Sequence, residues 1–268
     1  MFRRSIRVTA LIVALVSACA VPAPPSARNP TRKPQTLTVF AAASLTEAFT
    51  EIGRDFEAAH PGVTVAFSFG GSQNLRTQLE LGAVADVFAS ANQKEMEGAV
   101  TAGLVVSGAA QVFLTNQLIV ILPQDNPGRV EKLEDLARSG LKLVLAAEDV
   151  PVGSYSRQVL EELETQFGAG FKDKTLANVV SNEDNVKQIV AKVQLGEADA
   201  GLVYGSDAVA APELKTLAIP TGFNVIAQYP IAALARAPHP DLAQAFVGDV
   251  LSSAGQAVLK KWGFIPIH

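Results

Sequence analysis

The stretch LTVFAAASLTEAFTEIGRDFEAA, residues 37–59, determines the fold that the sequence predicts. Leu37–Phe40 alternates apolar and β-favouring residues, which predicts a short buried strand. Apolar residues then recur at helical spacing, so a helix follows. Ser44 precedes this helix and Glu47 comes three residues later, which is the spacing of a capping box and makes Ser44 the predicted N-cap. A strand that runs through small residues into a helix leaves N–H groups and a hydroxyl free to hold an anion.

The same arrangement occurs three more times along the chain. The alternating strand Val63–Phe69 leads through two glycines to Ser72 and a second helix. A third helix start falls at Val152–Ser154, with its helix from about Tyr155, and a fourth has Val186 in its first turn. Alternating strands and helices predict a doubly wound α/β fold, whose ligands bind at the carboxyl ends of the strands. The four helix starts, two from each half, are therefore expected to face one crevice.

The order of the elements predicts two lobes, each a mixed sheet flanked by helices, with the ligand cleft between them. Residues 36–115 form the first lobe, and the tail, residues 229–268, returns to complete it. Residues 116–228 form the second lobe. The chain crosses between lobes near Thr115–Gln117 and again near Gln228, and two crossings of this kind make a hinge.

Residues 1–18 are predicted to be a lipoprotein signal peptide. Arginines near the start precede the apolar run Val8–Val16, which is too short to span a bilayer permanently. The run ends in VSAC, which resembles the bacterial lipobox, so Cys19 is expected to become a lipidated first residue. An ordinary signal peptide with an incidental cysteine is the alternative. Cys19 is the one cysteine of the chain, so no intramolecular disulfide can form.

Residues 19–35 are rich in proline, alanine and serine and have no apolar periodicity, which is typical of a flexible tether. An exported domain tethered to the cell membrane is therefore expected, on the outer face of the plasma membrane or in the periplasm. The formal net charge of the chain is −4, and it becomes more negative without the leader arginines. This charge argues against nucleic acid as a partner, but local donors in a cleft can still bind a small anion.

Catalytic and metal-binding motifs are not found in the sequence. The three histidines have no metal-ligand spacing, and no HExxH, CxxC, GxSxG or Walker motif occurs. Gly70-Gly71-Ser72 resembles a nucleophile elbow but lacks the second flanking glycine and a histidine partner. The sequence thus predicts a protein that is not an enzyme and needs no cofactor or metal cation.

The predicted helix starts carry neutral donors, with no lysine or arginine placed to meet an anion. Such donors suit an oxyanion without a proton, because a protonated one also needs an acceptor. Sulfate, molybdate and tungstate are the tetrahedral anions of this kind.

Five blocks carry a resemblance to a known family: VFAAASLTEAF, FGGSQNLRTQLELGA, ADVFASANQKEM, VPVGSYSRQVLEEL and NEDNVKQIVAKVQLGEADAGLVYGSDA. In order and spacing they resemble the molybdate-binding proteins of bacterial ABC importers, which have the type II periplasmic-binding-protein fold. The resemblance covers essentially all of residues 37–264. It implies that the oxyanion is held by the residues Ser44 and Ser72 of one lobe and Val152, Val186 and Tyr204 of the other. The valines would contribute backbone N–H groups. Tyr204 rests on the resemblance alone, because the residue pattern by itself predicts a core aromatic at the end of a strand.

A transport protein is therefore the leading hypothesis: a monomer that captures molybdate, and tungstate as well, and delivers it to the membrane permease of an ABC importer. A carrier of sulfate or another tetrahedral oxyanion is the first alternative. An oxyanion sensor is the second, although a transcription regulator would need a DNA-binding helix pair where this chain has a leader and a tether. An enzyme using the crevice is disfavoured by the missing base and cofactor loop.

Overall fold

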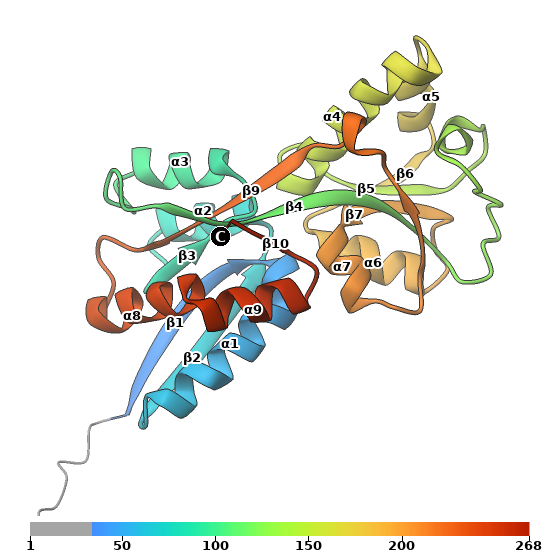
Figure 1. The fold of residues 1–268 in the computed structure, drawn as a ribbon. Coiled ribbons are helices and arrows are strands. Elements are labelled where there is room, and N and C mark those ends of the chain that lie inside the picture. Colours follow the sequence, from blue (N-terminus) through green and yellow to red (C-terminus); the bar gives the residue numbers. More distant parts are fainter. Residues whose placement is uncertain (1–33, 268) are drawn as a thin grey trace, which may run out of the picture. The chain divides into compact units, whose positions relative to one another are not determined.

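The computed structural model describes residues 34–267, so the predictions for the signal peptide and Cys19 lie outside the described residues. The fold is mixed α/β, as the sequence predicts, with helices packed around one ten-stranded sheet. The strand order is β2-β1-β3-β9-β4-β7-β5-β6, and β8 and β10 both pair with β4 (Figure 1).

The strands are β1 Gln35–Ala42, β2 Val63–Gly70, β3 Val87–Ala89, β4 Gln111–Leu122, β5 Leu143–Ala146, β6 Val179–Glu183, β7 Ala200–Tyr204, β8 Lys215–Ala218, β9 Ile226–Ala233 and β10 Ile265–Pro266. The α-helices are α1 Thr46–Ala59, α2 Ser72–Glu80, α3 Gln93–Thr101, α4 Pro151–Phe167, α5 Phe171–Leu176, α6 Val186–Gln194, α7 Gly205–Ala210, α8 Pro240–Leu251 and α9 Ser253–Lys261. The described residues also form three 3₁₀ turns, η1 Ala43–Leu45, η2 Leu133–Ala137 and η3 Thr221–Phe223.

The sheet contains two groups of parallel strands. In the first group β1 pairs in parallel with β2 and β3, and in the second group β5 pairs in parallel with β6 and β7. The long strands β4 and β9 lie between the groups and pair antiparallel with each other, with Thr115 opposite Gln228 (Figure 1). The carboxyl ends of the parallel strands lead into η1, α2, α6 and α7, which is where doubly wound sheets bind ligands.

Aromatic packing joins the start of the fold to its end. Phe49 and Phe56 on α1 are buried, and both lie edge-on to Phe246 of α8, with ring centroids 5.9 and 5.4 Å apart. Burying a phenylalanine stabilises a fold by roughly 1.5–3 kcal/mol. The C-terminal helices therefore cover the same face of the first strand group as α1.

Two predicted helix starts are wrong in detail. Helix α1 begins at Thr46, and Ser44 lies inside the 3₁₀ turn η1, where its hydroxyl caps no N–H. The capping box is therefore absent, because the extra 3₁₀ turn moves Ser44 away from the N-cap position. Helix α4 begins at Pro151 rather than near Tyr155. Proline suits the first helical position, since its fixed φ is helical and its missing N–H has no partner there anyway.

Strand β4 begins at Gln111 and therefore runs through Thr115–Gln117, where the chain is predicted to cross between the lobes. The short elements α5, α7, β8 and β10 were not predicted. Each has few residues, so its periodicity is too short to detect.

Candidate functional site

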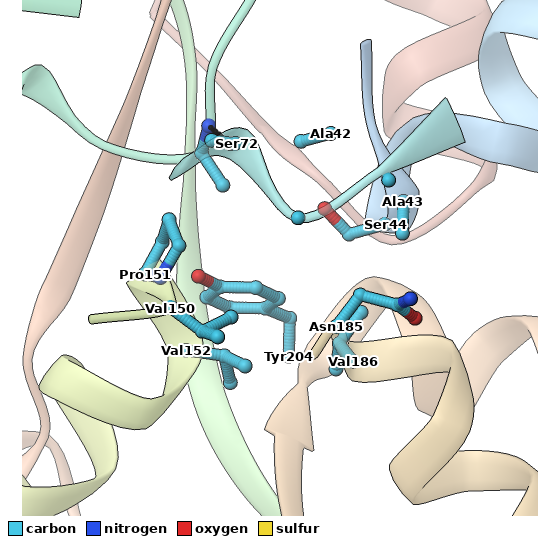
Figure 2. A pocket seen from close by; sticks show the side chains of 13 residues that line it. Ala42, Ala43, Ser44, Ser72, Val150, Pro151, Val152, Asn185, Val186 and Tyr204 are labelled. Atoms are coloured by element: carbon cyan, nitrogen blue, oxygen red, sulfur yellow. Dashed lines mark hydrogen bonds between the residues drawn. The ribbon is translucent and has the colours of Figure 1, made fainter. Parts of the chain in front are cut away.

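One small cavity lies at the carboxyl ends of the parallel strands, with a volume of about 20 Å³. It is lined by Ala42, Ala43, Ser44, Gly70, Gly71, Ser72, Ala91, Val150, Pro151, Val152, Asn185, Val186 and Tyr204. All five residues that the sequence analysis names for the oxyanion are among them. Ser44 and Ser72 lie on one side of the cavity, and the two valines and Tyr204 on the other (Figure 2). A single water needs roughly 10–15 Å³ and drug-sized ligands about 300–1,000 Å³, so the cavity fits one small group of atoms.

Two helix starts, at Val152 and Val186, lie on the second side of the cavity. The first N–H groups of a helix have no partner within it. In α4 the first residue, Pro151, has no N–H, so Val152 supplies the first free donor. In α6 the first residue is Val186, and the side chain of Asn185 caps the helix by accepting from the Gln188 N–H at 3.2 Å. The Asn185 side chain thus bonds the N–H of Gln188 and not that of Val186. The Val186 N–H remains available to donate to a ligand.

The serine hydroxyls on the first side are each held by another group. Ser72 Oγ accepts a hydrogen bond from the Ala91 N–H at 3.0 Å. Because an N–H can only donate, the Ser72 proton is free for a further acceptor. Ser44 Oγ lies 3.0 Å from the hydroxyl of Tyr229, a bond in which either oxygen can donate.

The Tyr204 hydroxyl has no hydrogen-bond partner within residues 34–267, although the residue is buried. Burial raises its pKa well above the ordinary value, so the phenol keeps its proton and can donate. A buried polar group without a partner costs roughly 1–3 kcal/mol. A ligand oxygen in the cavity would supply the missing acceptor.

The cavity lining contains no charged side chain. Lys187 follows Val186 but is bound elsewhere, with Nζ 2.8 Å from Glu47 Oε2 and 3.2 Å from Asp207 Oδ1. Asp207 is fully buried beside Tyr204, whose N–H it accepts at 3.3 Å. Burial raises the pKa of Asp207 to about 6, with the Lys187 charge acting in the opposite direction. The cavity itself therefore presents neutral dipoles to its contents.

The two sides of the cavity touch beside it. Gln73 Nε2 on α2 donates to the Asp184 carbonyl at 3.2 Å. A Cβ on Gly71 would lie 2.3 Å from the same carbonyl oxygen, closer than any side chain can approach. Glycine at position 71 thus permits the close approach.

Sequence reasoning missed several residues that support the site. Tyr229 and Glu47 bind Ser44 and Lys187, which lie 185 and 140 positions away, and no local pattern identifies such pairs. Asp207 accepts from the nearby Tyr204 N–H and also pairs with Lys187 of α6. Asn185 was detectable, because asparagine directly before a helical pattern is a preferred N-cap.

Residues 34–267 hold no group of three or more His, Cys, Asp or Glu side chains able to bind a metal ion. No helix in this part of the chain has the length and apolar character needed to cross a membrane.

Comparison with known proteins adds four findings. Residues 37–265 match the family described as bacterial extracellular solute-binding protein. The chain is 40% identical over 259 residues to the molybdate-binding protein ModA of Mycobacterium tuberculosis, covering 96% of this chain and 95% of that protein. The fold is similar to that of the periplasmic molybdate-binding protein of Azotobacter vinelandii, with a TM-score of 0.76, 22% identity and coverage of 87% and 100%. It is equally similar to that of the sulfate-binding protein SubI of Mycobacterium tuberculosis, with a TM-score of 0.78, 18% identity and coverage of 87% of each chain.

Proposed function

This chain belongs to the family of bacterial extracellular solute-binding proteins, and from that premise we propose that it binds molybdate and delivers it to the permease of an ABC importer. Tungstate, which has the same shape and charge, is proposed as a second ligand. The molybdate is held as an oxyanion by Ser44, Ser72, Val152, Val186 and Tyr204, and no metal cation takes part.

The observation that carries this proposal is a cavity of about 20 Å³ that is lined by three hydroxyl side chains, the Asn185 amide and the starts of two helices, with no charged side chain. Hydrogen bonds to a charged group contribute roughly 1.5–3 kcal/mol each. Five such bonds, less the cost of ordering the complex, are compatible with micromolar to nanomolar binding, about −8 to −12 kcal/mol.

Catalysis is not part of the proposal. The lining contains no histidine, carboxylate, cysteine or lysine that could act as a base for Ser44 or Ser72. Binding and release of an unchanged anion need no such group.

Two proposed lobes, residues 36–115 with 229–268 and residues 116–228, would close over the anion. The hinge would lie where β4 and β9 pair, at Thr115 and Gln228. In this arrangement each lobe contributes part of the donor set, so binding and closing are one equilibrium. The protein is proposed to act as a monomer.

Attachment to the membrane through lipidated Cys19 is proposed from the lipobox-like VSAC sequence. The test is a Cys19→Ala variant, which should no longer fractionate with membranes. Equal processing and fractionation of the variant and the parent would rule out the anchor.

Calorimetry of the soluble domain tests the binding proposal directly. Molybdate and tungstate should bind in the micromolar to nanomolar range, sulfate more weakly and phosphate most weakly. Tightest binding of sulfate would favour the sulfate carrier instead. Absence of heat with all four anions would reject the function.

A further inference from the structure

Tyr229 stands behind the cavity and does not line it. The residue lies in β9, is 0% exposed, and places its hydroxyl 3.0 Å from Ser44 Oγ. Its ring is held edge-on by Phe113, Tyr204 and Phe264, with centroids 6.5, 5.7 and 5.8 Å away. These aromatic contacts hold the Tyr229 ring, and with it the phenol oxygen, in place beside the Ser44 hydroxyl.

The direction of this bond decides what Ser44 offers to the cavity. If Ser44 donates to Tyr229, its lone pairs face the cavity and it acts as an acceptor. If Tyr229 donates, the Ser44 proton is free and the serine acts as a donor. A phenol is a stronger acid than an aliphatic alcohol and a poorer acceptor, since its lone pair is delocalised into the ring. Donation from Tyr229 to Ser44 is therefore the favoured direction.

Ser72 shows the same arrangement with no ambiguity. Its oxygen accepts from the Ala91 N–H at 3.0 Å, so its proton is left for the cavity. Burial raises the pKa of Tyr229 well above the ordinary value, so the phenol keeps its proton at neutral and mildly alkaline pH. With both serines held in this way, and no partner for the Tyr204 hydroxyl among residues 34–267, each hydroxyl of the cavity has a proton to donate.

We propose that Tyr229 is a positioning residue that sets anion specificity: by donating to Ser44 it fixes that hydroxyl as a donor, so the cavity rejects oxyanions that carry a proton, such as hydrogen phosphate. This inference rests on the proposed oxyanion-binding function. A protonated oxyanion entering the cavity would face one of these donor hydroxyls with its own O–H. Sulfate, which carries no proton at neutral pH, meets no such conflict.

The test compares phosphate with sulfate, because these anions are close in size and differ in the proton. Each would be measured by displacement of bound molybdate at mildly alkaline pH, where phosphate is mainly hydrogen phosphate. In Tyr229→Phe the Ser44 hydroxyl can rotate and accept. Phosphate affinity relative to sulfate should therefore rise roughly threefold to tenfold, the effect of one hydrogen bond. Tyr155→Phe removes the phenol of a partly buried tyrosine that does not line the cavity; it is the control and should leave this ratio unchanged.

A double-mutant comparison separates positioning from a structural role. Ser44→Ala should also raise the phosphate-to-sulfate ratio, and adding Tyr229→Phe to it should change the ratio no further. The Ser44→Ala arm tests the inference even if Tyr229→Phe fails to fold. Equal losses for sulfate and phosphate in either single variant would overturn the inference. If the wild-type protein binds molybdate in the same experiment, the proposed function still stands even when the inference about Tyr229 is overturned.

Discussion

Lys187 and Glu47, which lie 140 positions apart in the sequence, form an ion pair with Nζ 2.9 Å from Oε1 and 2.8 Å from Oε2. Glu47 lies on α1, three residues after Ser44 of η1, and Lys187 directly follows Val186 on α6. The ion pair therefore links the two sides of the cavity right beside the proposed anion contacts. Lys187 also lies 3.2 Å from Asp207 Oδ1, so the lysine keeps a partner when Glu47 is replaced.

Glu47→Gln should speed the release of molybdate. Both side chains are about a quarter to a third exposed, and ion pairs with such access to water contribute roughly 0.2–1 kcal/mol. The affinity should therefore fall by up to about fivefold, mostly through faster dissociation. Raising the salt concentration should reduce the difference between the variant and the wild type, because salt screens the wild-type pair. Dissociation rates measured by rapid mixing give the result.

Glu51→Gln is the matched control for this experiment. Glu51 lies one turn further along α1 and pairs with Lys261 of α9, at 2.8 Å, on the same side of the cavity. Its loss should leave the dissociation rate unchanged. Similar acceleration in both variants would mean that the Glu47 pair has no special role in retaining the anion.

Gly71→Ala should weaken molybdate binding. The backbone of Gly71 has φ −63° and ψ 133°, which alanine adopts freely, so the substitution introduces no backbone strain. The added Cβ would lie 2.3 Å from the Asp184 carbonyl oxygen and would push the two sides of the cavity apart. Overpacking of this kind costs roughly 1–3 kcal/mol, or about fivefold to a hundredfold in affinity.

Gly248→Ala is the control, since a Cβ there meets nothing within 4 Å, and it should bind like the wild type. Small-angle scattering with saturating molybdate should give a larger radius of gyration for Gly71→Ala than for the wild type. Wild-type affinity in Gly71→Ala would show that the contact with Asp184 is not needed for binding.

The local sequence pattern was sufficient to predict the strands and helices whose ends lie at the cavity. Strand, small residues and helix follow one another within about 20 residues, so their periodicities and turn signals are all local. The topology of a doubly wound sheet then places the carboxyl ends of the strands together. Ser44, Ser72, Val152 and Val186 were found at helix starts in this way, and the structure places all four around one cavity.

Contacts between distant residues could not be predicted from one sequence. Ser44 and Tyr229 are 185 positions apart, and nothing near either residue indicates the other. Partners far away in the sequence also explain why the predicted capping box does not form. Ser44 and Glu47 have the correct spacing, but the hydroxyl of Ser44 bonds Tyr229 and the carboxylate of Glu47 bonds Lys187. Tertiary partners overrode a local motif that was present in the sequence.

Tyr204→Phe should weaken molybdate binding without loss of unliganded stability. The substitution keeps the buried ring and removes a hydroxyl that has no partner within the described residues. Losing one hydrogen bond to a charged ligand should reduce the affinity by about tenfold to a hundredfold, roughly 1.5–3 kcal/mol. Calorimetry gives the affinity, and urea unfolding without ligand gives the stability. Unaltered affinity in Tyr204→Phe would remove Tyr204 from the proposed site.

Asp207 should make the stability of the protein depend on pH. Burial raises its pKa from 3.8 to about 6, so between these values the folded state holds a proton that the unfolded state has lost. Stability rises with falling pH wherever the folded state binds more protons. The contribution of Asp207 is therefore greatest in acid and is lost as the pH rises through about 6. Between about pH 7 and pH 5 it should change the free energy of unfolding by on the order of 1 kcal/mol.

Asp207→Asn isolates this contribution, because asparagine keeps an oxygen that can accept the Tyr204 N–H and does not titrate. Glu51 and Asp135, whose pKa values are lowered by hydrogen bonds, titrate equally in both proteins and cancel from the difference. Urea unfolding across this pH range should show the wild type gaining stability relative to the variant as the pH falls. The opposite trend would mean that the pairing with Lys187 outweighs burial and holds the pKa of Asp207 below 3.8, as expected for a carboxylate stabilised in its charged form.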